Sequence, residues 1–183
     1  MTAPTADRPI DKTLAPTDVP PTGTHVVIAA DAATCAALAR LAEVLSVESL
    51  TAEVLVKPWS GAGFALEGRV RAALHQACVV TLEPVATTVD EPISLKLVPP
   101  EEMAKYAETP DEEGAIDVDA TVDLPEVFEG VVDVGAVVVE HFLVGIDPYP
   151  RKPGVVFDAA AAGVSVGPEA VSPFAALARL GKE

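Results

Sequence analysis

The sequence predicts an α+β fold, with a mostly antiparallel sheet of about five or six strands ordered as a meander and covered by two or three helices. Two observations predict this fold. Several segments alternate between apolar and polar residues, which is typical of strands with one buried and one exposed face. Other segments carry apolar residues at helical spacing behind a capping residue. No internal repeat is visible, and 183 residues suit a single domain.

The strictest alternation lies in residues 64–74, where we expect the central strand. Its apolar face contains Phe64, Leu66, Gly68, Val70, Ala72 and Leu74, and its polar face contains Glu67, Arg69, Arg71 and His75. After a break at Gln76, the same register continues through Cys78 and Leu82 to Pro84, which ends the ladder. We therefore expect Cys78, Leu82 and Pro84 in the structural core, with Cys78 buried and unpaired.

The other segments of the sheet are weaker but follow the same pattern. Strands are expected at residues 25–29, 50–57, 89–97, 116–122 and 127–132. A turn-rich connector at residues 58–63 joins the second of these strands to the central strand as an antiparallel hairpin. Pro100 suits the first turn of a short helix. Residues 147–154 contain three prolines and must form a loop.

Capping residues predict two longer helices. Asp31 can cap an Ala-rich helix over residues 32–45. The apolar face of this helix contains Cys35, Leu38, Leu41 and Leu45. Asp133 can cap a helix over residues 134–144, which Gly145 would end in a left-handed conformation. Valine is a poor helix former, so propensity favours a strand for this segment, but the caps favour the helix.

The two ends of the chain differ from this core domain, which covers residues 25–158. Residues 1–24 are rich in Pro and Thr, so we expect a flexible arm there, with docking through Ile10, Leu14 and Val19 as the alternative. We expect residues 159–183 to form a linker of small residues followed by a short helix.

Ser172 should cap the C-terminal helix, and Pro173 should occupy its first position. Its apolar edge consists of Phe174, Leu177 and Leu180. A helix of about nine residues is unstable alone in water, so it must dock on its own domain or bind a partner. We expect it to help recruit a partner, and permanent docking is the alternative.

Charge narrows the classes of partner. Twelve basic and 28 acidic residues give a net charge of -16, which disfavours direct binding of bare RNA because nucleic-acid affinity comes largely from Lys and Arg. Residues 90–140 hold 15 acidic residues against two lysines. This stretch is either a solvated surface or a docking surface for a basic partner. The basic residues that we consider for interactions are Arg69, Arg71, Arg151 and Lys152.

Two cysteines, Cys35 and Cys78, are too few for a disulfide framework, so we expect reduced thiols and a cytoplasmic protein. The N-terminus lacks the apolar region of a signal peptide, and no apolar run is long enough to span a membrane, so we expect no membrane association.

Three motifs resemble the YceD family of large-ribosomal-RNA accumulation proteins. They are CVVTLEP at residues 78–84, DVG at residues 133–135 with EHFL at 140–143, and SPFAAL at 172–177. The loop at residues 147–154 looks like an alphaproteobacterial variant of the family. The resemblance implies a non-enzymatic factor that supports accumulation of large-subunit ribosomal RNA and ribosome assembly. It implies contact with a ribosomal protein or a large-subunit assembly intermediate.

Many family members carry a second Cys three residues after the first and further Cys near the C-terminal third, which suggests a metal site. This sequence departs from that pattern, because Thr81 stands at the second position and no Cys follows Cys78. We therefore expect no metal and no cofactor. The scattered histidines suggest no catalytic set, so we expect no enzyme activity; an RNA-processing or hydrolytic enzyme remains the alternative.

Overall fold

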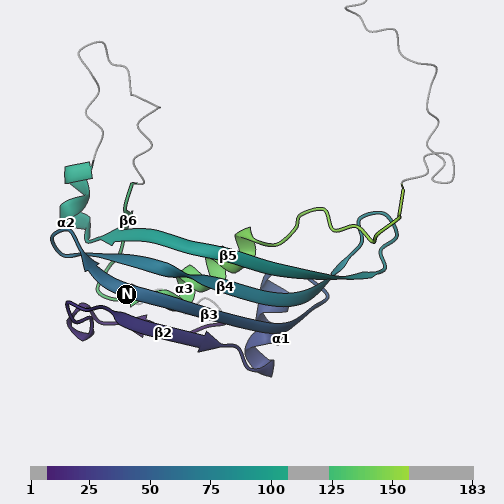
Figure 1. The fold of residues 1–183 in the computed structure, drawn as a ribbon, viewed down its shortest axis with the longest axis horizontal. Helices are drawn as coiled ribbons and strands as arrows, with labels where there is room; N and C mark the ends of the chain where they lie inside the picture. Colours follow the sequence, from purple (N-terminus) through teal and green to yellow (C-terminus); the bar gives the residue numbers. More distant parts are fainter. Residues whose placement is uncertain (1–7, 107–123, 157–183) are drawn as a thin grey trace, which may run out of the picture.

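The computed structural model describes residues 8–106 and 124–156. The main sheet has the order β2, β3, β4, β5, β6 (Figure 1). Its strands are β2 (Thr24–Ala29), β3 (Ser46–Trp59), β4 (Gly63–Ala77), β5 (Pro84–Val98) and β6 (Glu126–Val127). The first four form an antiparallel meander, whereas β6 pairs in parallel with the end of β5. The predicted α+β class and mostly antiparallel sheet are confirmed.

The two longer helices lie behind the sheet in Figure 1. These are α1 (Ala32–Leu41) and α3 (Val134–Val144). A shorter helix, α2 (Pro100–Met103), and the 3-10 turn η2 (Ala104–Tyr106) follow β5, so the predicted helix at Pro100 is confirmed. The remaining elements are the pair β1 (Thr13–Leu14) and β7 (Val132–Asp133), with the 3-10 turn η1 (Pro16–Asp18) after β1.

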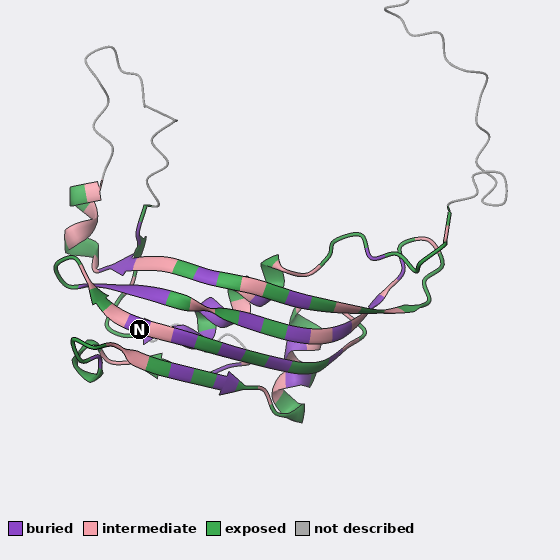
Figure 2. Ribbon diagram, in the orientation of Figure 1, coloured by how far each residue is buried: buried purple, intermediate pink, exposed green. Residues whose placement is uncertain are grey.

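Burial alternates along the strands, as Figure 2 shows. On β4, Leu66 and Val70 are completely buried and point towards the helices, whereas Glu67 and Arg69 are exposed. Leu38 of α1 and Phe142 of α3 are also completely buried and belong to the same core. The helix-facing side of the sheet therefore holds the core, and the opposite side is polar.

Both predicted N-caps are confirmed. The carboxylate of Asp31 accepts a hydrogen bond from the Thr34 N–H at 2.7 Å, and that of Asp133 accepts one from the Ala136 N–H at 2.9 Å. The predicted left-handed Gly145 is wrong, because its φ is -76°. The helix α1 also ends at Leu41, earlier than predicted, since Glu43 takes a left-handed conformation with φ of 54°.

The early end of α1 changes its apolar face. Cys35 and Leu38 are buried as predicted, whereas Leu41 and Leu45 are 47% and 55% exposed. The strand predicted at residues 127–132 is also wrong, because two separate short strands, β6 and β7, stand at its ends. The strand predicted at residues 116–122 lies outside the described residues.

The described part of the N-terminal segment, from residue 8 onwards, contacts the core through single apolar side chains. Ile10 and Val19 are both buried. The Gly135 N–H donates to the Lys12 carbonyl at 2.9 Å, and a Cβ on Gly135 would overlap the Ile10 carbonyl oxygen. A glycine at the start of α3 therefore lets the N-terminal segment approach the helix backbone closely.

Candidate interaction surfaces

The polar face of the sheet carries a ladder of ion pairs that contains two of the predicted interaction residues. Asp90 of β5 contacts both arginines of β4, at 2.7 Å from Arg69 and 3.4 Å from Arg71. Beside them, Lys57 of β3 pairs with Glu67 at 2.7 Å. The hydrogen bond and positive charge of Arg69, together with the charge of Arg71, lower the pKa of Asp90. The carboxylate therefore stays ionised and keeps both guanidinium groups partnered.

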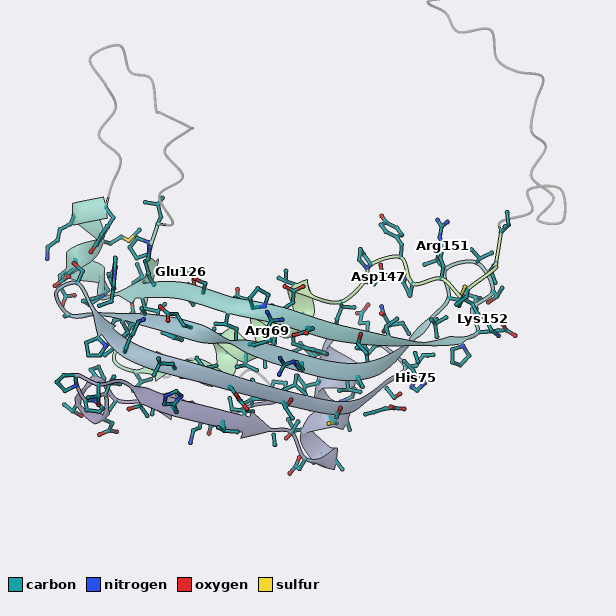
Figure 3. All side chains as sticks on the ribbon, in the orientation of Figure 1. Arg69, His75, Glu126, Asp147, Arg151 and Lys152 are labelled. Atoms are coloured by element: carbon teal, nitrogen blue, oxygen red, sulfur yellow. The ribbon has the colours of Figure 1, made fainter. Side chains whose placement is uncertain are left out.

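The second pair of predicted interaction residues lies elsewhere. Figure 3 shows Arg69 in the middle of the sheet and Arg151 and Lys152 at the far end, beyond the β4–β5 turn. Lys152 donates to Glu83 of that turn at 2.8 Å. The structure thus separates the two basic pairs instead of combining them into one patch. Phe174, Leu177 and Leu180 lie outside the described residues.

The β4–β5 turn departs from the prediction. The strand β4 ends at Ala77, and the Leu82 N–H donates to the Cys78 carbonyl at 2.9 Å, which closes a turn with Leu82 at φ of 60°. The predicted placement of Leu82 and Pro84 in the core is wrong, because Leu82 is 77% exposed and Pro84 is exposed at the start of β5. The extended register stops at the turn, so side chains beyond it no longer alternate towards the core.

Cys78 is fully buried and unpaired, as predicted. The loop at residues 147–154 covers it: the Lys152 N–H donates to Cys78 Sγ at 3.5 Å, and the Val79 N–H donates to the Pro150 carbonyl at 2.9 Å. Hydrogen bonds from the Thr81 hydroxyl and then from the main chain of Lys152, Thr81 and Val80 lower the pKa of the thiol to about 6.

Gln76, where a break in the central strand is predicted, lies inside β4. It does not break β4 but lies buried on the inward register between Leu74 and Cys78. Its Nε2 donates to the Asp147 carbonyl and its Oε1 accepts from the Thr87 hydroxyl, both at 2.8 Å. A polar residue at an inward position was the available signal for such an interstrand link. Gln76 thus joins β4, β5 and the start of the loop that covers Cys78.

The histidines lie on three different elements. His25 is on β2; His75 on β4 lies 3.1 Å from the Glu48 carboxylate; and His141 on α3 lies 2.9 Å from the Val137 carbonyl oxygen. Within residues 8–106 and 124–156, no three His, Cys, Asp or Glu side chains are placed to hold a metal ion. The helices in the described ranges are too short or too polar to cross a membrane.

The comparisons with known proteins place the chain in a family. The profile of the family described as "Large ribosomal RNA subunit accumulation protein YceD" matches residues 66–181, well over half of the chain. Comparison with curated proteins gave no match, and neither did comparison with solved structures. The matched span includes the Cys78 turn, its covering loop and α3. On this evidence, the chain belongs to the YceD family.

Proposed function

We propose that this chain is a non-enzymatic factor that supports accumulation of large-subunit ribosomal RNA by contacting a ribosomal protein or an assembly intermediate. Membership of the YceD family supports the role in ribosomal RNA accumulation. The preference for protein over bare RNA is inferred from the charges, and the separation of the three histidines supports a non-enzymatic role.

The preference for a protein partner rests on how many basic side chains are already paired with carboxylates. Six of the ten Lys and Arg residues in the described ranges form ion pairs with carboxylates. They are Arg8, Lys57, Arg69, Arg71, Lys105 and Lys152. A cation that already neutralises a carboxylate releases few counterions from a phosphate backbone, so it contributes little affinity for RNA.

The acidic residues support a basic partner. Residues 107–123, which connect η2 to the segment before β6, contain seven acidic residues and no basic residue. Glu126 and Glu129 follow directly, and neither forms an ion pair within the described part of the chain. Such a concentration of negative charge speeds encounter with a cationic protein and repels nucleic acid.

A crosslinking pull-down from cells at moderate salt tests the proposal. We expect tagged protein to capture large-subunit ribosomal proteins, and this capture should persist after RNase treatment. Replacing the seven acidic residues of 107–123 by Asn or Gln should reduce it, whereas the control Asp11→Asn, Glu43→Gln and Glu140→Gln should change it little. Enrichment of naked RNA without ribosomal proteins would overturn the proposal.

A further inference from the structure

The strand β2 forms one edge of the main sheet among the described strands. It pairs with β3 on one side, and no strand in the described ranges pairs with its other side (Figure 1). The direction of its main-chain groups follows from one hydrogen bond. The Ala30 N–H donates to the Leu50 carbonyl, which continues the register in which Ala29 lies opposite Thr51.

In an antiparallel pair, residues alternate between those bonded to the neighbouring strand and those whose N–H and C=O point the other way. Because Ala30 is bonded to β3, the even-numbered residues of β2 are bonded too. The N–H and C=O groups of His25, Val27 and Ala29 therefore point outward. No main-chain hydrogen bond to these groups occurs in the described part of the structure. Among the described residues, they form a row of three donors and three acceptors without a main-chain partner.

The other edge of the sheet is protected, and β2 is not. On that side the short strand β6 pairs only with Leu97 and Val98 at the end of β5, and the rest of β5 contains Pro92, which has no N–H, and the charged residues Asp90, Glu91 and Lys96. Gly145, after α3, also packs against the side chains of Val89 and Glu91. Proteins block edge strands in these ways to prevent unwanted pairing. By contrast, β2 has the sequence THVVIA, with no Pro and no Asp, Glu, Lys or Arg, and Val27 is 70% exposed.

Three acidic residues lie near this edge in the fold. Asp18 lies beside the start of β2, where the Thr24 hydroxyl donates to its carbonyl, and Asp31 lies two residues after the end of the strand. Glu53 lies opposite Val27 on β3. None of the three carboxylates forms an ion pair with a described residue. The edge strand therefore carries no charged residue of its own, and three acidic residues without a described ion-pair partner lie near it; Arg69, opposite Glu53 on β4, is paired with Asp90.

We propose that β2 accepts an extended cationic segment of a protein partner as an additional strand of the sheet. Main-chain hydrogen bonds to His25, Val27 and Ala29 would hold the segment, and its Lys or Arg side chains would meet the nearby carboxylates. A second copy of this chain fits less well, because each copy carries a net charge of -16. This inference rests on the proposed function for the identity of the partner, but not for the site itself.

The test uses the full chain and a fluorescent octapeptide of alternating Lys and Val. We expect saturable binding by fluorescence anisotropy. A peptide with Pro in place of each Val keeps the charge but lacks alternate N–H groups, and a peptide with Glu in place of each Lys reverses the charge. Both should bind at least about tenfold more weakly, since each loses several favourable contacts. Equal binding of the Lys–Val and Lys–Pro peptides would overturn strand addition.

Two variants of Val27 separate the main chain from the side chain. Val27→Pro removes one outward N–H without breaking the bonds to β3, and should weaken peptide binding about fivefold to tenfold. Val27→Thr keeps the N–H and should bind within about twofold of wild type. Circular dichroism and the melting temperature verify that both variants fold. If Val27→Pro binds as wild type does, the proposal is wrong.

Hydrogen exchange of the unaltered protein provides an independent measurement. The peptide should slow exchange of the His25, Val27 and Ala29 amides; unchanged exchange of all three at saturation overturns the proposal. Sedimentation that shows concentration-dependent dimers lost in Val27→Pro would assign the edge to a second copy instead. The pull-down separates the two proposals. If wild type and Val27→Pro capture the same ribosomal proteins equally, the proposal that β2 binds the partner is wrong, while the proposed function stands. If wild type captures none, the proposed function fails, and peptide binding still decides the edge.

Discussion

Replacing Gln76 by leucine should loosen the end of the sheet that covers Cys78. Leu has nearly the same volume as Gln and remains compatible with the strand, but it cannot bond to Thr87 or to the Asp147 carbonyl. Each neutral hydrogen bond contributes about 1 kcal/mol net. Residue Asp147 is exposed and Thr87 half-buried, so water replaces part of what is lost.

We therefore expect Gln76→Leu to lower the free energy of unfolding by about 1–2 kcal/mol, after the gain from the apolar side chain. For a chain of this size, that corresponds to a drop in melting temperature of about 3–6 °C. Urea unfolding and calorimetry measure both quantities. Thr87→Val removes one of the two bonds and should show about half of the effect. Thr88→Val, on the exposed face of β5, is the matched control and should stay within about 0.5 kcal/mol of wild type.

The loosening should also be local. The Val79 and Lys152 amides, which donate to Pro150 and to Cys78 Sγ, should exchange hydrogen faster in Gln76→Leu than in wild type. Amides in the middle of β3 and β4 should change only as much as global stability requires. A variant that melts at or above the wild-type temperature, with unchanged exchange at these two amides, would refute the role given to Gln76.

Four further predictions follow from the structure. Cys78→Ala should destabilise the protein. The pKa of the Cys78 thiol is lower in the folded chain, at about 6, than in the unfolded chain. The stabilisation that the thiolate gives to the folded wild-type protein should therefore grow as pH rises above 6 and disappear as pH falls through 6. Urea unfolding of both proteins between pH 5.5 and about 8.5 tests this, and a difference in unfolding free energy that does not change with pH would show it to be wrong. Gly68→Ala should cost about 1–3 kcal/mol in urea unfolding, because its Cβ would overlap the Glu53 carbonyl oxygen. Gly135→Ala should displace the N-terminal segment from α3, so limited proteolysis should cleave near Lys12 faster than in wild type. Asp90→Asn should release Arg69 and Arg71 and raise affinity for a poly(U) probe in a filter-binding assay, whereas Ser94→Asn on the same face should not.

The sequence allowed most of the fold to be predicted, because its signals are local. Asp31 and Asp133 cap helices through their own side chains, and the alternation on β4 follows from the pleat of a single strand. The end of β4 was not predictable in this way. Leu82 fits an apolar register, but the bond between its N–H and the Cys78 carbonyl turns the chain before that register applies.

The candidate interaction surfaces were harder to predict from the sequence than the fold, because they depend on contacts between residues far apart in the chain. The sequence indicated Arg69 and Arg71 as a basic cluster, but their partner Asp90 comes from the next strand and neutralises part of their charge. The edge position of β2 also follows from strand order, since a short apolar strand reads the same at an edge and in the middle of a sheet. The role of Gln76 could not be predicted from its neighbours in sequence, because both of its hydrogen-bond partners lie on other segments.

The pairing of β1 with β7 sets an order for the formation of the fold during synthesis. Thr13 lies opposite Asp133, 120 positions later in the chain, whereas β2, β3, β4 and β5 pair with strands close to them in sequence. Contacts between nearby segments close small loops and form early, whereas distant pairs close large loops at a greater entropic cost. On a translating ribosome, the meander can therefore form before Asp133 has left the exit tunnel, and until then Thr13 has no partner strand to pair with. The N-terminal segment is made first and takes its place last.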